Sequence, residues 1–417
     1  MEQLTLEVVQ RAVSGSAAAF RCRRRLQPAG GTGDKVFPPT FAGAVYAVEQ
    51  RRIPGREMPV TCVLLDSVQS QANRMELALQ EAIDAGKVRL PIIVVDFSGF
   101  DPTGDIEADQ ASGRLIDRVG RITSLQVPHR LADAILRDSN LDGHPFRKSA
   151  RGKTLNTVSV GNATPLLELC PTALLFGMWD SHGPKGGLGP KFERAMVSEI
   201  IGVGAEVADL RRGVRRDPLE IRAAVKVRKT PDSSWEVAKS EARGKDVVAP
   251  SEVGHSSVPF PKQRDKKTDE NYFDGATIEY AEQTTTLSLI CLRRLRFPLN
   301  GSVDPDVDVA ARTVLAALGL TAATLAFEAG TDLRSRCLLW PDGPMTWELL
   351  DRPGLEPEKY SLKGEEAILL LNGTVAQAKR KGLPWPEEPL ILKPSRALVD
   401  LVRLSQVEAT KEIVETP

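Results

Sequence analysis

The sequence contains little of what defines several large classes of protein. Its five cysteines are an odd number, lie far apart and include no C-x-x-C pair, which argues against a disulfide framework and a cysteine zinc site. They are expected to be reduced, mostly buried thiols. The longest apolar runs, such as the one at 92–95, have the length of strands, whereas a membrane span needs about 18–20 residues. The sequence therefore predicts no membrane segment.

The chain also lacks an excess of charge of either sign. Its 55 basic residues equal its 55 acidic ones, so any nucleic-acid binding must use local patches. Acidic residues near the C-terminus are expected to balance the total without neutralising those patches. The N-terminal residues show no signal-peptide pattern, so the cytoplasm is the expected compartment. Arginines cluster in four places: 21–25, 51–56, 211–216 and 293–296.

The motifs of common enzyme classes are incomplete. The Gly152-Lys-Thr string would need a glycine at Arg147 to form a phosphate-binding loop. The Gly202-Val-Gly string would need a glycine at Val207 to form a dinucleotide fingerprint. Only four histidines occur, none in a metalloprotease spacing. His129 or His182 could act as a general base in metal-free RNA cleavage, but a polar or structural role is the simpler interpretation.

Short apolar and amphipathic segments follow one another without a regular βα alternation, which indicates an α+β fold. The runs at 60–66 and 90–97 are predicted strands, and one or both should lie in the core of an antiparallel sheet. Residues 67–83 carry apolar side chains at helical spacing. Further strands are predicted at 173–179 and 276–289, and further helices at 129–138, 289–297 and 307–318.

Two loops or turns have side chains suited to binding phosphate. The start of the 67–83 helix presents hydroxyl, amide and guanidinium groups. The loop at 180–191 is rich in glycine and contains two lysines, so its backbone amides could hold an anion. An ordinary mobile loop explains the second pattern equally well.

The composition changes between 233 and 274, where charged residues, serine and proline dominate and large apolar side chains become sparse. This pattern predicts a flexible excursion. Residues 1–232 and 275–417 are then expected to form one folded unit together.

Several long strings, in order along the chain, resemble one family. They include LDSVQSQANRME from Leu65, HRLADAILRDS from His129, LFGMWDSHGPKGGLG from Leu175 and YAEQTTTLSL from Tyr280. These strings are similar to the Csb-one family, the Cas-seven-type backbone subunit, of the RAMP superfamily, in type I-U/I-G CRISPR Cascade complexes. The resemblance runs from about residue 21 to 341.

The resemblance implies an RRM-like, ferredoxin-like antiparallel sheet core, β-α-β-β-α-β in order, with large insertions that form thumb and finger elements. It implies a non-catalytic subunit, without a metal or other cofactor, that polymerises head-to-tail along the spacer of a CRISPR guide RNA in antiviral defence. The implied partners are the guide RNA, the target DNA strand, further copies of the chain, a Cas-five/Cas-six fusion subunit, a large subunit and a recruited helicase-nuclease.

Two alternatives remain open at this stage. One is a metal-independent RAMP endoribonuclease that processes the guide precursor, and the other is a scaffold that binds no nucleic acid. Under the leading hypothesis, the residues expected to contact RNA are Arg25, Lys35, Ser67, Gln69, Ser70, Asn73, Arg74, His129, Arg130, His182, Lys185, Gly187, Lys191, Arg293 and Arg294. Seven of them are predicted to converge on one groove: Ser67, Gln69, Asn73, Arg74, Arg130, Lys185 and Lys191.

Overall fold

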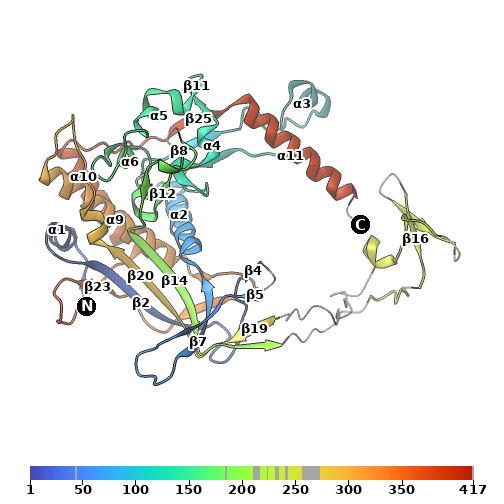
Figure 1. The fold of residues 1–417 in the computed structure, drawn as a ribbon, viewed down its shortest axis with the longest axis horizontal. Helices are drawn as coiled ribbons and strands as arrows, with labels where there is room; N and C mark the ends of the chain where they lie inside the picture. Colours follow the sequence, from blue (N-terminus) through green and yellow to red (C-terminus); the bar gives the residue numbers. More distant parts are fainter. Residues whose placement is uncertain are drawn as a thin grey trace.

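The protein is described by a computed structural model that covers residues 1–42, 45–183, 186–209, 217–222, 224–230, 234–239, 243–255 and 273–415. Its largest sheet has ten strands in this part of the chain (Figure 1). Four strands form its centre, each antiparallel to its neighbour, in the order β23 (Trp347–Leu350), β2 (Ala19–Pro28), β20 (Tyr280–Ser288) and β14 (Met196–Val203).

Two helices connect these strands and define the topology. The helix α2 (Val68–Asp84) lies between β2 and β14 in the chain, and α9 (Pro305–Glu328) lies between β20 and β23. The order is therefore β2-α2-β14-β20-α9-β23, and each β-α-β unit encloses a strand of the other. This is the β-α-β-β-α-β arrangement of ferredoxin-like folds, so the predicted fold class is confirmed.

Of the two apolar runs predicted as core strands, only one joins this sheet. The strand β7 (Val60–Asp66) pairs with β14 and with the edge strand β6 (Val48–Arg51). The other run contains β8 (Ile93–Asp96), which pairs in parallel with β25 (Leu390–Pro394) in a separate sheet. The prediction that one of the two runs lies in this sheet is confirmed for 60–66. The run at 90–97 lies outside it, because β8 pairs with β25, almost 300 residues further along the chain, and with residues 121–123.

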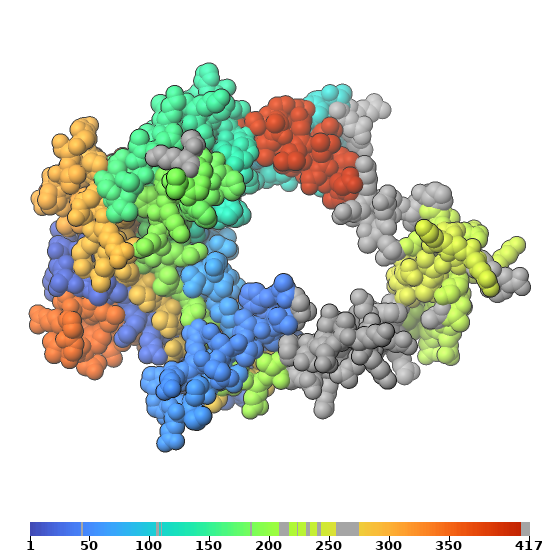
Figure 2. Space-filling model, viewed as in Figure 1, coloured from blue at the N-terminus to red at the C-terminus, as the bar shows by residue number. Residues whose placement is uncertain are grey.

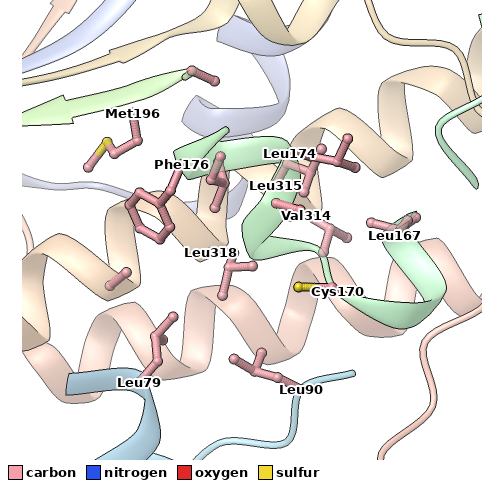
Figure 3. Close-up of a cluster of buried hydrophobic side chains, with 14 of the residues drawn as sticks. Leu79, Leu90, Leu167, Cys170, Leu174, Phe176, Met196, Val314, Leu315 and Leu318 are labelled. Atoms are coloured by element: carbon pink, nitrogen blue, oxygen red, sulfur yellow. The ribbon is translucent and has the colours of Figure 1, made fainter. Parts of the chain in front are cut away.

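The core lies between the main sheet and the helices on one of its faces. Side chains of α2, α7 (Thr172–Phe176) and α9 meet there around Leu79, Phe176 and Leu318 (Figure 3). Within the described residues, α9 is the helix that is long and apolar enough to cross a membrane, and 78% of its apolar window is buried inside the fold. Its hydrophobicity on all sides is expected of a helix in the middle of a core.

The apolar run at 173–179 was predicted as a strand, and this prediction is wrong. The structure forms the buried helix α7, followed by the short strand β12 (Met178–Trp179). A continuous apolar run does not distinguish a buried strand from a buried helix, because it lacks a period. The predicted helix at 307–318 is confirmed within α9. The one at 129–138 is a 3-10 turn, η1 (Arg130–Ala132), followed by α4 (Ala134–Arg137).

The connection between β14 and β20 contains a small second unit. Strands β17 (Trp235–Val237), β16 (Val227–Lys229) and β18 (Val247–Val248) form a three-stranded sheet that stands away from the main body in Figures 1 and 2. Ordered structure in this connection therefore begins before residue 233 and continues into the predicted excursion. Residues 256–272 of that excursion lie outside the described part.

The five cysteines are all free, and four of them are buried while Cys291 is half-buried, as expected. Burial raises the pKa of Cys22 to about 11, so this thiol stays protonated.

The remaining elements complete the two large sheets, several short ones and the helical layer: β1 (Glu2–Gln3), α1 (Leu6–Ser14), β3 (Lys35–Val36), β4 (Thr40–Phe41), β5 (Val45–Tyr46), α3 (Ile106–Ser112), β9 (Arg121–Thr123), β10 (Ser139–Leu141), β11 (His144–Pro145), η2 (Phe146–Lys148), α5 (Ala150–Thr154), α6 (Thr164–Leu169), η3 (Gly186–Leu188), β13 (Lys191–Phe192), β15 (Glu206–Asp209), η4 (Pro250–Val253), β19 (Phe273–Thr277), α8 (Leu289–Arg293), β21 (Thr331–Asp332), β22 (Leu338–Pro341), β24 (Glu358–Ser361), α10 (Gly364–Arg380) and α11 (Arg396–Glu415).

Candidate nucleic-acid interface

The start of α2 presents an exposed polar surface, here called the α2 turn (residues 67–74). Ser67 caps the helix, and its Oγ accepts a hydrogen bond from the backbone N–H of Ser70 at 3.2 Å. Gln69 and Asn73 are exposed and lie one turn apart. No acidic residue occupies this first turn, so the positive end of the helix dipole is not neutralised there. The α2 turn can therefore accept an anion.

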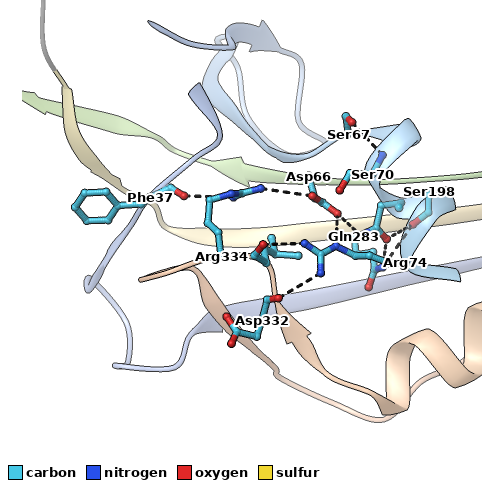
Figure 4. A network of polar contacts seen from close by, with 11 residues as sticks. Phe37, Asp66, Ser67, Ser70, Arg74, Ser198, Gln283, Asp332 and Arg334 are labelled. Carbon is cyan, nitrogen blue, oxygen red and sulfur yellow. Dashed lines mark hydrogen bonds and ion pairs between the residues drawn. The ribbon is translucent and has the colours of Figure 1, made fainter. Parts of the chain in front are cut away.

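Arg74 belongs to the same turn, but its guanidinium is already engaged (Figure 4). Its Nε donates to Asp66 Oδ2 at 2.9 Å, and Nη1 and Nη2 donate to the carbonyl oxygens of Asp332 and Leu333. Asp66 is only 1% exposed. Arg74 therefore anchors α2 to the end of β7, to β21 and to the residue that follows β21.

A second arginine, which sequence analysis missed, reaches the same carboxylate. Arg334 Nη2 lies 3.5 Å from Asp66 Oδ1, and its Nη1 donates to the carbonyl oxygen of Phe37 at 3.3 Å (Figure 4). Phe37 follows directly after β3, which contains Lys35. The segment that carries Lys35 is therefore fixed beside the α2 turn through Arg334. No local pattern relates Arg334 to Asp66, because 268 residues separate the two positions, from 66 to 334.

The glycine-rich segment forms a second surface, here called the β12–β13 hairpin (residues 178–192). Met178 and Phe192 are buried and pair across the two strands. Because side chains alternate between the faces of a strand, the next pair, Trp179 and Lys191, points outward. The Lys191 Nζ lies 5.5 Å from the centroid of the Trp179 ring. His182 and Gly187 are exposed on the same hairpin, and Lys185 lies outside the described residues.

Two glycines of this hairpin are required by the packing around Asp180. A Cβ on Gly183 would collide with the Asp180 carboxylate, and one on Gly189 would collide with the Asp180 carbonyl oxygen. Asp180 itself is buried and accepts a hydrogen bond from Arg147 Nη2 at 2.6 Å. Gly187 faces open space. The glycine pattern therefore has a structural cause at 183 and 189, and only Gly187 of the three leaves room for a ligand.

Arg130 is interior rather than part of a surface. It is 8% exposed, and its Nε and Nη2 donate to the two carboxylate oxygens of Glu76, both at 2.7 Å. Its Nη1 donates to the carbonyl oxygens of Phe176 and Gly177. Burial raises the pKa of Glu76, and the Arg130 guanidinium opposes that rise. The expected RNA contact by Arg130 does not fit this structure, in which the residue ties the base of the β12–β13 hairpin to α2. Its neighbour His129 is exposed.

The arginine cluster at 21–25 lies mainly on the open face of the main sheet, where carboxylates accompany it. Arg21 pairs with Glu348 at 2.8 Å and Arg23 with Glu282 at 2.7 Å. Arg25 lies 3.5 Å from Asp342, and its guanidinium is 4.0 Å from the centroid of the Tyr280 ring. The carboxylates that neutralise this patch therefore come from strands of the sheet and the loop after β22, and not from the acidic residues near the C-terminus.

The other described arginine clusters are also partly neutralised. Arg51 pairs with Glu199 at 2.7 Å and with Glu49, and Arg56 pairs with Glu279. Arg294 lies 2.9 Å from Glu193, and Arg293 donates to the carbonyl oxygen of Ala17. A phosphate at any of these sites would have to compete with a carboxylate or a carbonyl group. The cluster at 211–216 lies outside the described residues.

The fold and these surfaces define a class: an α+β protein with a ferredoxin-like core and two exposed polar surfaces attached to α2. Residues 20–207 match the model of a protein family described as CRISPR-associated protein GSU0053. This region, from β2 through β14, is similar to a CRISPR-associated protein family. It contains the α2 turn and the whole β12–β13 hairpin. A comparison with curated protein sequences found no match.

Proposed function

We propose that this protein is a guide-RNA-binding subunit of a CRISPR surveillance complex, and that copies of it line the spacer as a backbone. The observation that carries the proposal is that residues 20–207, which match the CRISPR-associated family, contain both exposed surfaces, the α2 turn and the β12–β13 hairpin. The ferredoxin-like core supports it, because RRM-type RNA-binding domains share that topology.

The α2 turn and the β12–β13 hairpin suit a ligand whose sequence varies. The capped helix start and the amides of Gln69 and Asn73 offer donors to phosphate and ribose oxygens, and Lys191 offers a cation. Contacts to the backbone are independent of sequence, so base pairing is left to select the target strand. The further partners proposed are the target DNA strand, a Cas-five/Cas-six fusion subunit, a large subunit and a helicase-nuclease.

The test is binding of the pure protein to labelled single-stranded RNAs of equal length and unrelated sequence, measured by fluorescence anisotropy at several salt concentrations. Affinities that agree within about threefold and fall with salt, by roughly 0.7 logarithmic units per tenfold salt for each phosphate neutralised, are expected. Absence of binding at low salt, or binding of one sequence alone, would contradict the proposal.

We also propose that the subunit does not cut RNA. The alternative, a metal-independent endoribonuclease, would use His129 or His182, and both are exposed. The two hypotheses predict different results when labelled guide precursor is incubated with the pure protein: the RNA stays intact in the first and is cleaved in the second. Cleavage that is lost in His129→Ala or His182→Ala would establish the endoribonuclease.

A further inference from the structure

Trp179 is a large aromatic side chain on the surface of an otherwise well-packed hairpin. It is 52% exposed, although removing apolar surface from water is the main driving force of folding. Strand alternation explains the direction of the side chain, because Met178 and Phe192 occupy the inner face. Among the described residues, Lys191 makes the ring contact with Trp179. About half of Trp179 is therefore accessible to a ligand.

The backbone beneath this ring is held by contacts at both ends of β12. The carbonyl oxygen of Gly177 accepts from Arg130, which is bound to Glu76 of α2. On the other side, Asp180 is fixed by Arg147, and its backbone N–H donates to the carbonyl oxygen of Pro190 at 3.0 Å. A ring on a fixed backbone loses little conformational entropy when a ligand stacks on it.

The two cations beside the ring, Lys191 and Arg194, lack carboxylate partners among the described residues, because the nearby Glu193 and Asp180 pair with Arg294 and Arg147. Lys191 and Arg194 are exposed and form no ion pair with the described residues, and the Cγ of Arg194 lies close to Gly177. The arginines on the open sheet face differ, because each of Arg21, Arg23 and Arg25 has an acidic partner. A phosphate can therefore approach Lys191 without displacing a carboxylate.

An exposed indole next to a free ammonium group fits one nucleotide of a single strand, with the base on the ring and its phosphate on the cation. We propose that Trp179 is a stacking platform for one unpaired base of the bound RNA, and that Lys191 contacts the adjoining phosphate. This inference rests on the proposed function, since it names the residues of that same site. Stacking accepts every base, which suits a guide of variable sequence.

The test separates stacking from charge by the salt dependence of RNA affinity. Trp179→Ala should weaken binding about fivefold or more, since one stacked base contributes about 1–3 kcal/mol, and should leave the salt slope unchanged. Lys191→Gln should reduce the slope by roughly 0.7. Trp179→Phe, which keeps a ring, should fall between wild type and Trp179→Ala. The matched control is Trp340→Ala, because Trp340 is 71% exposed on β22.

Three results would overturn the inference. One is wild-type affinity in Trp179→Ala, and another is an equal loss in Trp340→Ala. The third is a Trp179→Ala protein that binds RNA normally but no longer associates with further copies, which would make the ring a protein contact. Failure of the wild-type protein to bind any RNA would instead refute the proposed function. If Trp179→Ala does not fold, iodouridine-labelled RNA can be photocrosslinked to the wild-type protein instead. The peptide that contains Trp179 is expected among the crosslinked products. Its absence would contradict the stacking platform.

Discussion

At the scale of single residues, two arginines expected to hold RNA instead connect parts of the fold. Arg74 joins Asp66 to the carbonyl oxygens of Asp332 and Leu333, and Arg130 joins Glu76 to those of Phe176 and Gly177. A guanidinium suits this role because its donors form a rigid planar fork that reaches several acceptors at once. Sequence reasoning recognised both residues as special but could not tell a buried fork from an exposed cation.

Replacing Arg74 with alanine is expected to lower the free energy of unfolding by about 2 kcal/mol, the loss typical of hydrogen bonds to a charged group. Arg334 and Gln71 still contact Asp66, which limits the loss. Chemical denaturation measures it, with Asn73→Ala as the control because Asn73 is exposed one residue away. Unchanged stability together with weaker RNA binding would show instead that Arg74 contacts the RNA directly.

Replacing Arg130 with alanine should destabilise the protein by about 3–5 kcal/mol, because it leaves the Glu76 carboxylate buried without its partner. The loss should depend on pH. Burial already raises the Glu76 pKa above its usual 4.5, and removal of the guanidinium raises it further. The folded variant then binds a proton more readily than the unfolded chain, so its stability falls as pH rises above about 4.5.

Denaturation of Arg130→Ala at pH 5 and pH 8 checks this sign, and the variant should lose more stability relative to wild type at pH 8. In the double variant Glu76→Gln/Arg130→Ala, the difference between the two pH values should shrink, since the buried carboxyl group is gone. An equal loss at both pH values in Arg130→Ala would show that Glu76 is not the group responsible.

At the scale of elements, α2 is the part that its own sequence specifies best. Apolar residues at helical spacing over 67–83 predict its buried face and nearly its bounds, and the structure adds Ser67 as the cap. The parallel pairing of β8 with β25, the helix α7 and the contact of Arg334 with Asp66 could not be predicted in this way. The β8–β25 pairing and the Arg334 contact join segments that meet only in the folded chain, which local periodicity does not reveal. The apolar run that contains α7 has no period that would distinguish a helix from a strand.

A negative charge on the exposed face of α2 should affect stability and RNA binding differently. Gln69→Glu places a carboxylate in the first turn, where the helix dipole stabilises it by about 0.3–1 kcal/mol, so the variant should melt at the same or a higher temperature. The same charge should repel phosphate and weaken RNA binding about fivefold, the effect of roughly 1 kcal/mol between charges about 4 Å apart in water.

Asn73→Asp should weaken RNA binding similarly. The control is Asn372→Asp, the same substitution at an exposed position of α10. Melting curves and anisotropy titrations on the same preparations give both quantities. If Asn73→Asp and Asn372→Asp alter affinity equally, the α2 turn does not contact the RNA.

At the scale of the whole molecule, two surfaces have different electrostatic character. The open face of the ferredoxin-like sheet, which RRM domains use for RNA, has its arginines matched by carboxylates. The α2 turn and the outer side of the β12–β13 hairpin offer donors and cations with fewer acidic neighbours. The fold class was predictable from the order of short apolar and amphipathic segments and from family resemblance. The different charge of the two surfaces was not, because cross-strand pairing determines which charges meet.

The central claim is that the protein binds guide RNA, and the RNA that the protein retains in cells tests it most directly. The chain would be purified by an affinity tag from cells that express it with its neighbouring gene products and a CRISPR array, and the bound RNA would be sequenced. The account predicts guide RNAs from every spacer of the array, in proportions that do not follow spacer sequence. Purified complexes that carry only random cellular RNA, or none, would contradict it.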